Sequence, residues 1–350
     1  MTTPVSSQEF QAQSEGRLPA AEEVAEGVWT LPQRNRSGHM PFTLCYLIAD
    51  SAGGIHVLDP GWDLDGNAGI LEAALTRLGA PSGVPVSAIV THLHPDHTGL
   101  AGRLQALHGT RVVMHRREHE AQQAYASWVS DRSQIRADLQ TWAVPAGRFE
   151  EVMGYAAGSP RVVVPADQLV EDGELLQIPG RRLRVLHTPG HTPGHLCLVD
   201  EDRRLLFSGD QLLPRVTPGM GAAGGFPGNP LELYLQSLQR LSAYDDCENL
   251  PGHEYRYRGI AARARAIARR HLIRTAEVEQ VLLADPGAAV WQTAERLSWG
   301  RGWDALTRHY LVSALRQTAM HMALVQSGAH TDAFEAWGRP NAAGPRPHNT

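Results

Sequence analysis

Four side chains that can bind a metal lie within six residues, in the segment HLHPDH at residues 92–97. The segment follows an apolar run at residues 86–90, a pattern typical of a buried strand that ends in a loop. Alternate residues of an extended chain share a face, so the first two histidines point the same way. The turn after the proline can bring Asp96 and His97 to a second point nearby. Such an arrangement could hold two metal ions a few ångströms apart.

Further histidines and carboxylates occur where other expected strands end. Asp59 closes an apolar run, and Asp210 and His253 each follow an apolar run and a turn residue. His191 lies in a Gly/Pro-rich loop between two expected strands, which also contains His195. Because the ends of neighbouring strands meet at one edge of a sheet, these side chains can converge there. Any one of them alone is weak evidence, but the ordered set around HLHPDH is specific.

Length and composition predict a cytoplasmic globular protein. The 350 residues are 42% hydrophobic and 20% charged, enough for a full core and more than one domain. No apolar run is long enough to cross a membrane, so no membrane partner is expected, and no secretory leader is expected either. The three cysteines are widely separated, which fits a reducing cytoplasm.

The net charge of −5 is unevenly distributed, and all 32 basic residues are arginine. Residues 1–253 carry a balance of −10, whereas residues 254–350 carry +5. A basic C-terminal segment could meet nucleic acid. Arginines on solvated helix faces are the simpler interpretation.

Sequence patterns predict a tail at each end of the chain, a helical insertion and a small C-terminal domain. Residues 1–20 are polar without periodicity and are expected to be a disordered tail. Residues 116–158 have a helical composition between strands, which predicts an insertion that is either a lid over the site or a surface embellishment. Nearly all of the chain after residue 256 has helical patterns, which predicts a small C-terminal domain, and residues 339–350 form a loose tail.

Five segments, in this order, resemble the metallo-β-lactamase-fold hydrolases, which include glyoxalase II-like thioesterases and lactonases. They are HVLDPG (56–61), THLHPDH (91–97), TPGHTPGH (188–195), FSGDQLL (207–213) and LPGHEY (250–255). The resemblance covers about residues 25–270. It implies an α+β fold, a four-layer αβ/βα sandwich with the metals at one edge.

The same resemblance implies roles for the site residues. Ligands of the first metal would be His92, His94 and His191. Ligands of the second metal would be Asp96, His97 and His253. Asp210 would bridge the two metals, while Asp59 and His195 would orient the ligands without binding metal.

This ligand set indicates a specific chemistry. Neutral imidazoles and carboxylates suit two Zn²⁺ ions, with Mn²⁺ or Fe²⁺ as alternatives. A water shared by two cations loses a proton near neutral pH and becomes the nucleophile for an ester, thioester or lactone carbonyl. Asp96 would be the catalytic residue, because it can hold that water and carry a proton to the leaving group. A related sulfur dioxygenase uses one iron and fewer ligands than the set found here.

The C-terminal part carries a second resemblance, to the β-lactamase-like protein 2 subgroup, which has a small winged-helix-like C-terminal domain. It rests on residues 229–238, 250–255 and 297–303. We therefore expect the following organisation: a tail at 1–20, a catalytic domain at 21–270 with the insertion at 116–158, a winged-helix-like domain at 271–338, and a tail at 339–350.

Three functions from different classes follow. The first is a dinuclear zinc hydrolase of a small acyl substrate, acting as a monomer or homodimer. The alternative is a metal-dependent endoribonuclease that cleaves single-stranded RNA, an activity linked to the second resemblance. The third is a nucleic-acid-binding regulator, which is disfavoured because its candidate recognition helix, residues 288–297, has one arginine and one glutamate.

Overall fold

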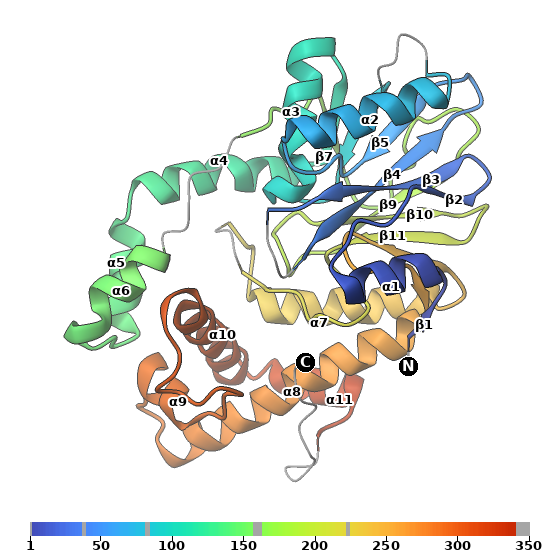
Figure 1. The fold of residues 1–350 in the computed structure, drawn as a ribbon. Coiled ribbons are helices and arrows are strands. Elements are labelled where there is room, and N and C mark those ends of the chain that lie inside the picture. Colours follow the sequence, from blue (N-terminus) through green and yellow to red (C-terminus); the bar gives the residue numbers. More distant parts are fainter. Residues whose placement is uncertain (1, 37–39, 81–84, 157–162, 222–224, 341–350) are drawn as a thin grey trace.

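The computed structural model describes residues 2–36, 40–80, 85–156, 163–221 and 225–340, except for the side chains of residues 126–130. Two β-sheets lie face to face (Figure 1). The first has the strand order β2 (Glu22–Ala25), β3 (Val28–Arg34), β4 (Phe42–Ala49), β5 (Ile55–Leu58), β6 (Ser87–Val90), β7 (Arg111–His115) and β8 (Gln168–Val170). The second has the order β1 (Thr3–Pro4), β13 (Tyr257–Arg258), β12 (Glu248–Pro251), β11 (Leu205–Gly209), β10 (Leu196–Asp200) and β9 (Leu183–His187).

Helices enclose the two sheets and extend beyond them. The first half of the chain forms α1 (Ser7–Glu15), α2 (Asp65–Arg77), α3 (Pro95–His108), α4 (Arg116–Ser130), α5 (Ser133–Thr141) and α6 (Ala146–Ala156). The second half forms α7 (Pro230–Leu241), a 3₁₀ turn at Ser242–Tyr244, α8 (Ile260–Ala284), α9 (Val290–Arg296), α10 (Arg308–Gln326) and α11 (His330–Trp337). None of these helices in the described part is long and apolar enough to cross a membrane.

Alternating apolar side chains create four layers. Tyr46 and Leu198 point into the core between the sheets, while their neighbours Leu47 and Val199 point to the outer faces. Leu47 packs in a cluster with α2 and α3, and Val199 packs in a cluster with α7 and α8. The order is therefore helices, sheet, sheet, helices, which confirms the expected α+β four-layer sandwich (Figure 1).

The strand directions bring the loops with the motifs to one edge. Strands β5, β6, β7 and β8 are parallel neighbours, and β11 runs parallel to β12. Parallel strands end at the same edge, so the residues after β5 and β6 in one sheet lie near those after β11 and β12 in the other. The loop between the antiparallel strands β9 and β10 opens at this edge too.

The prediction of a disordered tail at residues 1–20 is wrong. Helix α1 begins after Ser6, whose hydroxyl accepts a hydrogen bond from the Glu9 amide, and it ends at Gly16 in the left-handed conformation. Ala12 is buried in the core between the sheets, and the buried Glu9 carboxylate accepts hydrogen bonds from the amide and guanidinium of Arg256. An ion pair, rather than an apolar stripe, anchors this helix, so hydrophobic periodicity did not reveal it.

The insertion and the C-terminal helices share one hydrophobic core. Leu139 and Val152 of the insertion pack in a cluster with Val278 of α8, Ala294 of α9 and Leu315 of α10. Figure 1 shows α5 and α6 beside α10, away from the two sheets. Residues 116–130, 133–141 and 146–156 of the predicted insertion are helical, and α5 and α6 pack against a part of the chain that lies more than a hundred residues away.

The helical character of the C-terminal region is also confirmed. However, the expected boundary between residues 270 and 271 falls inside the continuous helix α8, so no linker separates the two regions there. Past Arg258 the described residues contain helices but no β-strand that could form a wing, so the winged-helix form stays a prediction. Most of the expected tail, residues 341–350, lies outside the described residues.

Candidate metal centre

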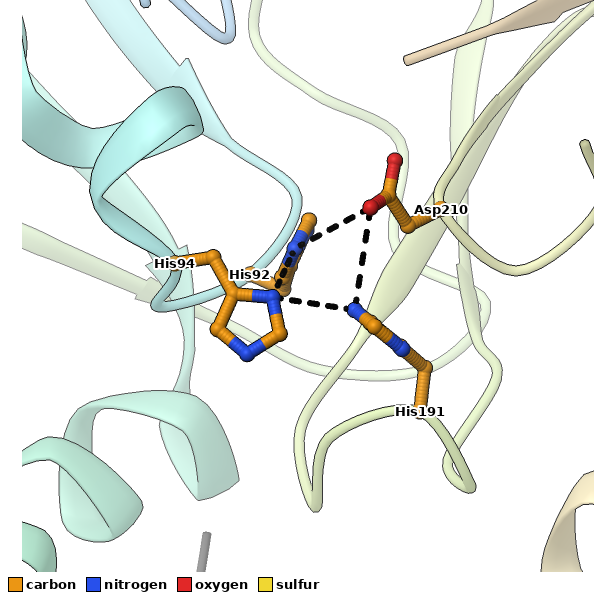
Figure 2. Close-up of side chains that lie close together, drawn as sticks. All are labelled: His92, His94, His191 and Asp210. Atoms are coloured by element: carbon orange, nitrogen blue, oxygen red, sulfur yellow. Dashed lines mark hydrogen bonds and ion pairs between the residues drawn. The ribbon is translucent and has the colours of Figure 1, made fainter. Parts of the chain in front are cut away.

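Three histidine nitrogens and one carboxylate oxygen converge at the edge of the sandwich. Figure 2 shows His92, His94, His191 and Asp210 turned toward a common point. His94 Nδ1 lies 3.0 Å from both His92 Nε2 and His191 Nε2, and Asp210 Oδ2 lies 4.0 and 3.8 Å from those same two Nε2 atoms. Ligands about 2.1 Å from a tetrahedral Zn²⁺ are about 3.4 Å apart, so these separations bracket the spacing that one ion needs.

A second set of four donors lies beside the first. His253 Nε2 is 3.3 Å from His97 Nε2 and 3.3 Å from Asp96 Oδ2. The other carboxylate oxygen of Asp210, Oδ1, is 3.5 Å from each of these two histidine nitrogens. The two oxygens of Asp210 therefore face different donor sets, which is the geometry of a carboxylate that bridges two cations.

The surroundings of Asp210 fit a bound cation. Its Oδ1 atom is buried, yet within the described residues it accepts no hydrogen bond. A buried, unsatisfied carboxylate oxygen is costly unless a positive charge faces it. Gly252 keeps this space open, because a Cβ atom at that position would lie 2.6 Å from Asp210 Oδ1 and 2.7 Å from His97 Cε1.

Hydrogen bonds orient the rings so that lone pairs face the centre. His97 donates from Nδ1 to Asp59 (2.8 Å), His191 donates to the Gly219 carbonyl (2.6 Å), and His253 donates to the Phe42 carbonyl (2.9 Å). A neutral imidazole with a proton on Nδ1 carries its lone pair on Nε2, the atom that points inward in each case. These partners are backbone carbonyls and a carboxylate, which also hold the ligands of known metal sites.

Charge balance in the metal-free site supports the same conclusion. Burial alone would lower the pKa of His253, but the carboxylates of Asp210 and Asp96 raise that pKa well above its usual range. Burial would raise the pKa of Asp210, but His253 and His97 hold it well below the usual range. The carboxylates thus favour a positive charge at this position, and a divalent cation would supply one. By contrast, burial and the neighbouring histidines hold the pKa of His92 well below its usual range.

Asp59 forms hydrogen bonds with Thr91 and with the donor residue His97. One oxygen accepts from the Thr91 amide (2.8 Å), and the other accepts from the Thr91 hydroxyl (2.7 Å) and from His97 Nδ1 (2.8 Å). The Thr91 hydroxyl in turn lies 3.0 Å from His92 Nδ1. Asp59 also forms a cluster with His92 and His97, but these bonds already use both of its oxygens. Its left-handed backbone, with φ 52°, is a strained conformation that the loop holds in place.

His195 occupies a similar supporting position. Its Nε2 accepts a hydrogen bond from the Asp210 amide (3.2 Å), so its Nδ1 carries the proton and donates to the Thr188 hydroxyl (2.9 Å). Nε2 is therefore bound to the backbone at Asp210 and Nδ1 to Thr188, so both ring nitrogens already have partners within the protein.

Sequence reasoning missed one group that touches Asp96. The Asn35 side chain donates from Nδ2 to Asp96 Oδ2 (3.0 Å) and accepts from Trp62 Nε1 at its own Oδ1 (2.6 Å). Asn35 follows β3 and Trp62 follows the HVLDPG segment, so both lie at the same sheet edge as the histidines. A lone asparagine in a polar loop carries no sequence signal that would distinguish it.

The family model of the metallo-beta-lactamase superfamily matches residues 41–253 of this chain. The chain belongs to the metallo-beta-lactamase superfamily. The matched span contains all the residues of both donor sets. The family expected from the five motifs is thereby confirmed.

Two proteins of known activity are similar to parts of this metallo-beta-lactamase superfamily chain. The acyl-coenzyme A thioesterase MBLAC2 of Bos taurus is 35% identical over 178 residues, which are 48% of this chain and 56% of that protein. The chain thus matches little more than half the length of this relative. The hydroxyacylglutathione hydrolase GloC of Haemophilus influenzae is 27% identical over 213 residues, which are 60% of this chain and 84% of that protein.

A solved structure is similar over nearly the whole chain. A metallo-beta-lactamase family protein from Thermus thermophilus has a TM-score of 0.67 and 27% sequence identity, and the match covers 88% of this chain and 96% of that one. The match therefore extends beyond the family model, which ends at His253.

Proposed function

We propose that this protein is a hydrolase that uses two divalent cations, with Zn²⁺ as the first choice, to cleave an ester, thioester or lactone of a small acyl substrate. The observation that carries the proposal is the pair of donor sets that share Asp210, with one carboxylate oxygen facing each set. In this proposal His92, His94 and His191 bind the first cation, and Asp96, His97 and His253 bind the second.

The chain's own residues prepare the site for this reaction. Bound cations would supply a water that ionises near neutral pH and would polarise the substrate carbonyl. Asp96, held by Asn35 at Oδ2, is placed to accept a proton from that water and later deliver it to the leaving group. His195 and Asp59 hold the backbone and rings of the ligand residues, so the donors need little reorganisation.

An acyl substrate is favoured by the two relatives of known activity, both of which are named for hydrolysis of an acyl compound. We carry only the acyl class to this chain, because the first relative is matched over 56% of its length. The particular acyl group and its carrier are not part of the proposal.

The contacts of the C-terminal arginines argue against nucleic acid as the substrate. Several of them are bound to carboxylates, carbonyls or aromatic rings of the chain itself: Arg256, Arg263, Arg274, Arg296 and Arg339. The candidate recognition helix, α9, buries Trp291 and Ala294 in the core that it shares with the insertion. Part of the basic excess is therefore engaged within the protein, which weakens the argument from charge for both nucleic-acid hypotheses.

The test is hydrolysis of a model acyl thioester by the zinc-loaded chain, with Asp96→Asn measured alongside. Asp167→Asn is the matched control, because Asp167 also accepts a hydrogen bond from a side-chain amide, that of Gln105, but lies beside the start of β7 at the opposite sheet edge. We expect turnover in the wild type and the control, and a loss of at least about 100-fold in Asp96→Asn.

Full activity of a folded Asp96→Asn variant would refute the catalytic assignment. A wild-type protein that holds two metals but hydrolyses no ester, thioester or lactone would refute the acyl class. Single-stranded RNA would then be the next substrate to assay.

A further inference from the structure

A buried carboxylate outside the ligand set joins the two loops that supply the first donor set. Glu118 is fully buried. Its Oε1 accepts a hydrogen bond from the Leu93 amide (2.7 Å), and its Oε2 accepts one from the Gly194 amide (2.7 Å). Leu93 lies between His92 and His94, and Gly194 lies in the loop that carries His191. One carboxylate therefore connects the backbones that present all three histidines of the first set.

The same face of α4 supports the histidine loop by packing. Ala121 and Tyr125, three and seven residues after Glu118, are buried in a cluster with the side chain of Leu93. Positions i, i+3 and i+7 share one side of a helix, so α4 contacts both the amide and the side chain of the same residue.

The contact with the second loop is equally close. A Cβ atom at Gly194 would overlap the backbone of Arg117 and Glu118, so only glycine allows this approach. Glu118 also lies in the first turn of α4, where the helix dipole stabilises a negative charge. The helix end and the two amides together offset the cost of burying the carboxylate.

The two hydrogen bonds need an acceptor oxygen at each of two positions. A carboxylate offers an acceptor oxygen to each of two amides, whereas a glutamine side chain offers one acceptor and one NH₂ donor. In a Glu118→Gln variant the NH₂ group would face one of the two backbone N–H groups. One loop would lose its attachment while the size of the side chain stays the same.

We propose that Glu118 is a positioning residue for the first metal site: it sets the distance between the His92–His94 loop and the His191 loop, and it makes the insertion part of the metal centre. The inference rests on the proposed dinuclear site. In this proposal α4 supports the metal-binding loops, a function that differs from a lid over the site and from a surface embellishment.

The experiment measures Zn²⁺ binding by competition with a chromogenic chelator, and the visible spectrum of the Co²⁺-substituted full-length protein. For Glu118→Gln we expect one of the two binding events to weaken by about 10–100-fold, the range for partners that orient metal ligands. The second event, which uses Asp96, His97 and His253, should stay unchanged. The Co²⁺ bands of the first site should shift, and the amides of Leu93 and Gly194 should exchange hydrogen faster.

The matched control is Asp50→Asn, and Glu118→Asp is the conservative variant. The Asp50 side chain is also largely buried, and its Oδ1 accepts hydrogen bonds from two amides, those of Ala52 and Gly54, but it lies at the opposite end of the sheet. Asp50→Asn should leave both metal affinities unchanged. Glu118→Asp keeps the charge but is one methylene shorter, so it should weaken the first site less than Glu118→Gln does.

Three results would overturn the inference. The first is unchanged affinity and an unchanged Co²⁺ spectrum in Glu118→Gln. The second is equal weakening of both sites with loss of stability, as a purely structural role predicts. A wild-type chain that binds no metal would refute the proposed function and this inference together, whereas the first two results leave the proposed function intact.

Discussion

Substitution of Gly252 by alanine offers a sensitive test of the metal centre. The glycine follows β12 and directly precedes His253. Its backbone is not in the left-handed region, so alanine introduces no conformational strain of its own. The new Cβ atom would lie 2.6 Å from Asp210 Oδ1 and 2.7 Å from His97 Cε1. The variant therefore changes the crowding at these two residues and little else.

The size of the displacement can be worked out from these distances. To reach ordinary contact at 3.4 Å, the Asp210 oxygen must move by about 0.8 Å. The glycine cannot easily move instead, because its amide donates to the Gly209 carbonyl and its carbonyl accepts from the Leu44 amide, both at 2.7 Å. Metal–ligand distances tolerate about 0.2 Å, so the shift exceeds the tolerance roughly fourfold.

We expect Gly252→Ala to lose the second cation and with it the bridging geometry. The affinity of that site should fall by at least about 100-fold, equivalent to about 2.8 kcal/mol. Overpacking should lower the free energy of unfolding of the metal-free protein by about 1–3 kcal/mol. Isothermal titration with Zn²⁺ and thermal unfolding with and without metal measure the two effects separately.

Gly69→Ala is the matched control for this substitution. Gly69 is an exposed residue within α2, with nothing within 4 Å of an added Cβ, so alanine should stabilise the helix by roughly 0.5–1 kcal/mol and leave metal binding unchanged. Retention of two metals with wild-type affinity and full turnover in Gly252→Ala would refute the donor geometry on which the proposed function depends.

Three further predictions concern metal, pH and the N-terminal helix. Dialysis against a strong chelator should abolish thioester hydrolysis and lower the melting temperature, and Zn²⁺ should restore both; an unchanged melting temperature would mean that the native state binds no cation. Burial alone would lower the pKa of His97 and of His253, but nearby carboxylates raise both pKa values, so protons are held more tightly than by ordinary histidine. Metal affinity should therefore rise as the pH rises through these raised pKa values and fall below them, and a pH-independent affinity would contradict the ligand assignment. Glu9→Gln should lower the free energy of unfolding by about 2 kcal/mol. This is less than the cost of losing a buried ion pair completely, because other carboxylates still face Arg256. Urea unfolding that matches the wild type would show that α1 contributes nothing to stability.

Much of the candidate site could be predicted because its residues follow strands. Asp59 closes an apolar run, Asp210 and His253 each follow an apolar run and a turn residue, and parallel strand ends meet at one edge. Spacing alone could not predict that the two oxygens of the Asp210 carboxylate face different donor sets.

Other groups that hold the donor residues in place, such as Glu118 and the Gly219 carbonyl, could not be predicted in this way. Glu118 is one of several acidic residues in a helical segment, and nothing in its neighbours distinguishes it from a solvated surface position. The Gly219 carbonyl that orients His191 belongs to the backbone and has no signature in the sequence. Both act through long-range contacts that depend on how the loops fold, and local patterns carry no information about such contacts.

The N-terminal helix and the C-terminal region show the same limit for the fold. The residues after Ser6 look disordered because they are polar, yet Glu9 meets Arg256 from a distant part of the chain. Similarly, the insertion and the last helices look like two separate additions, because the sequence does not show that Leu139 and Leu315 belong to one core.

That shared core has a consequence for synthesis of the protein on the ribosome. The insertion leaves the ribosome well before its partners in α8, α9 and α10, which are made later. Until those helices emerge, apolar side chains such as Ile135, Leu139 and Val152 have no partners from the C-terminal region to cover them. Helix α8 also joins the core behind β10 and β11 at its start, so its emergence completes both regions. The sandwich and its helical extension therefore mature together, once α8, α9 and α10 have emerged.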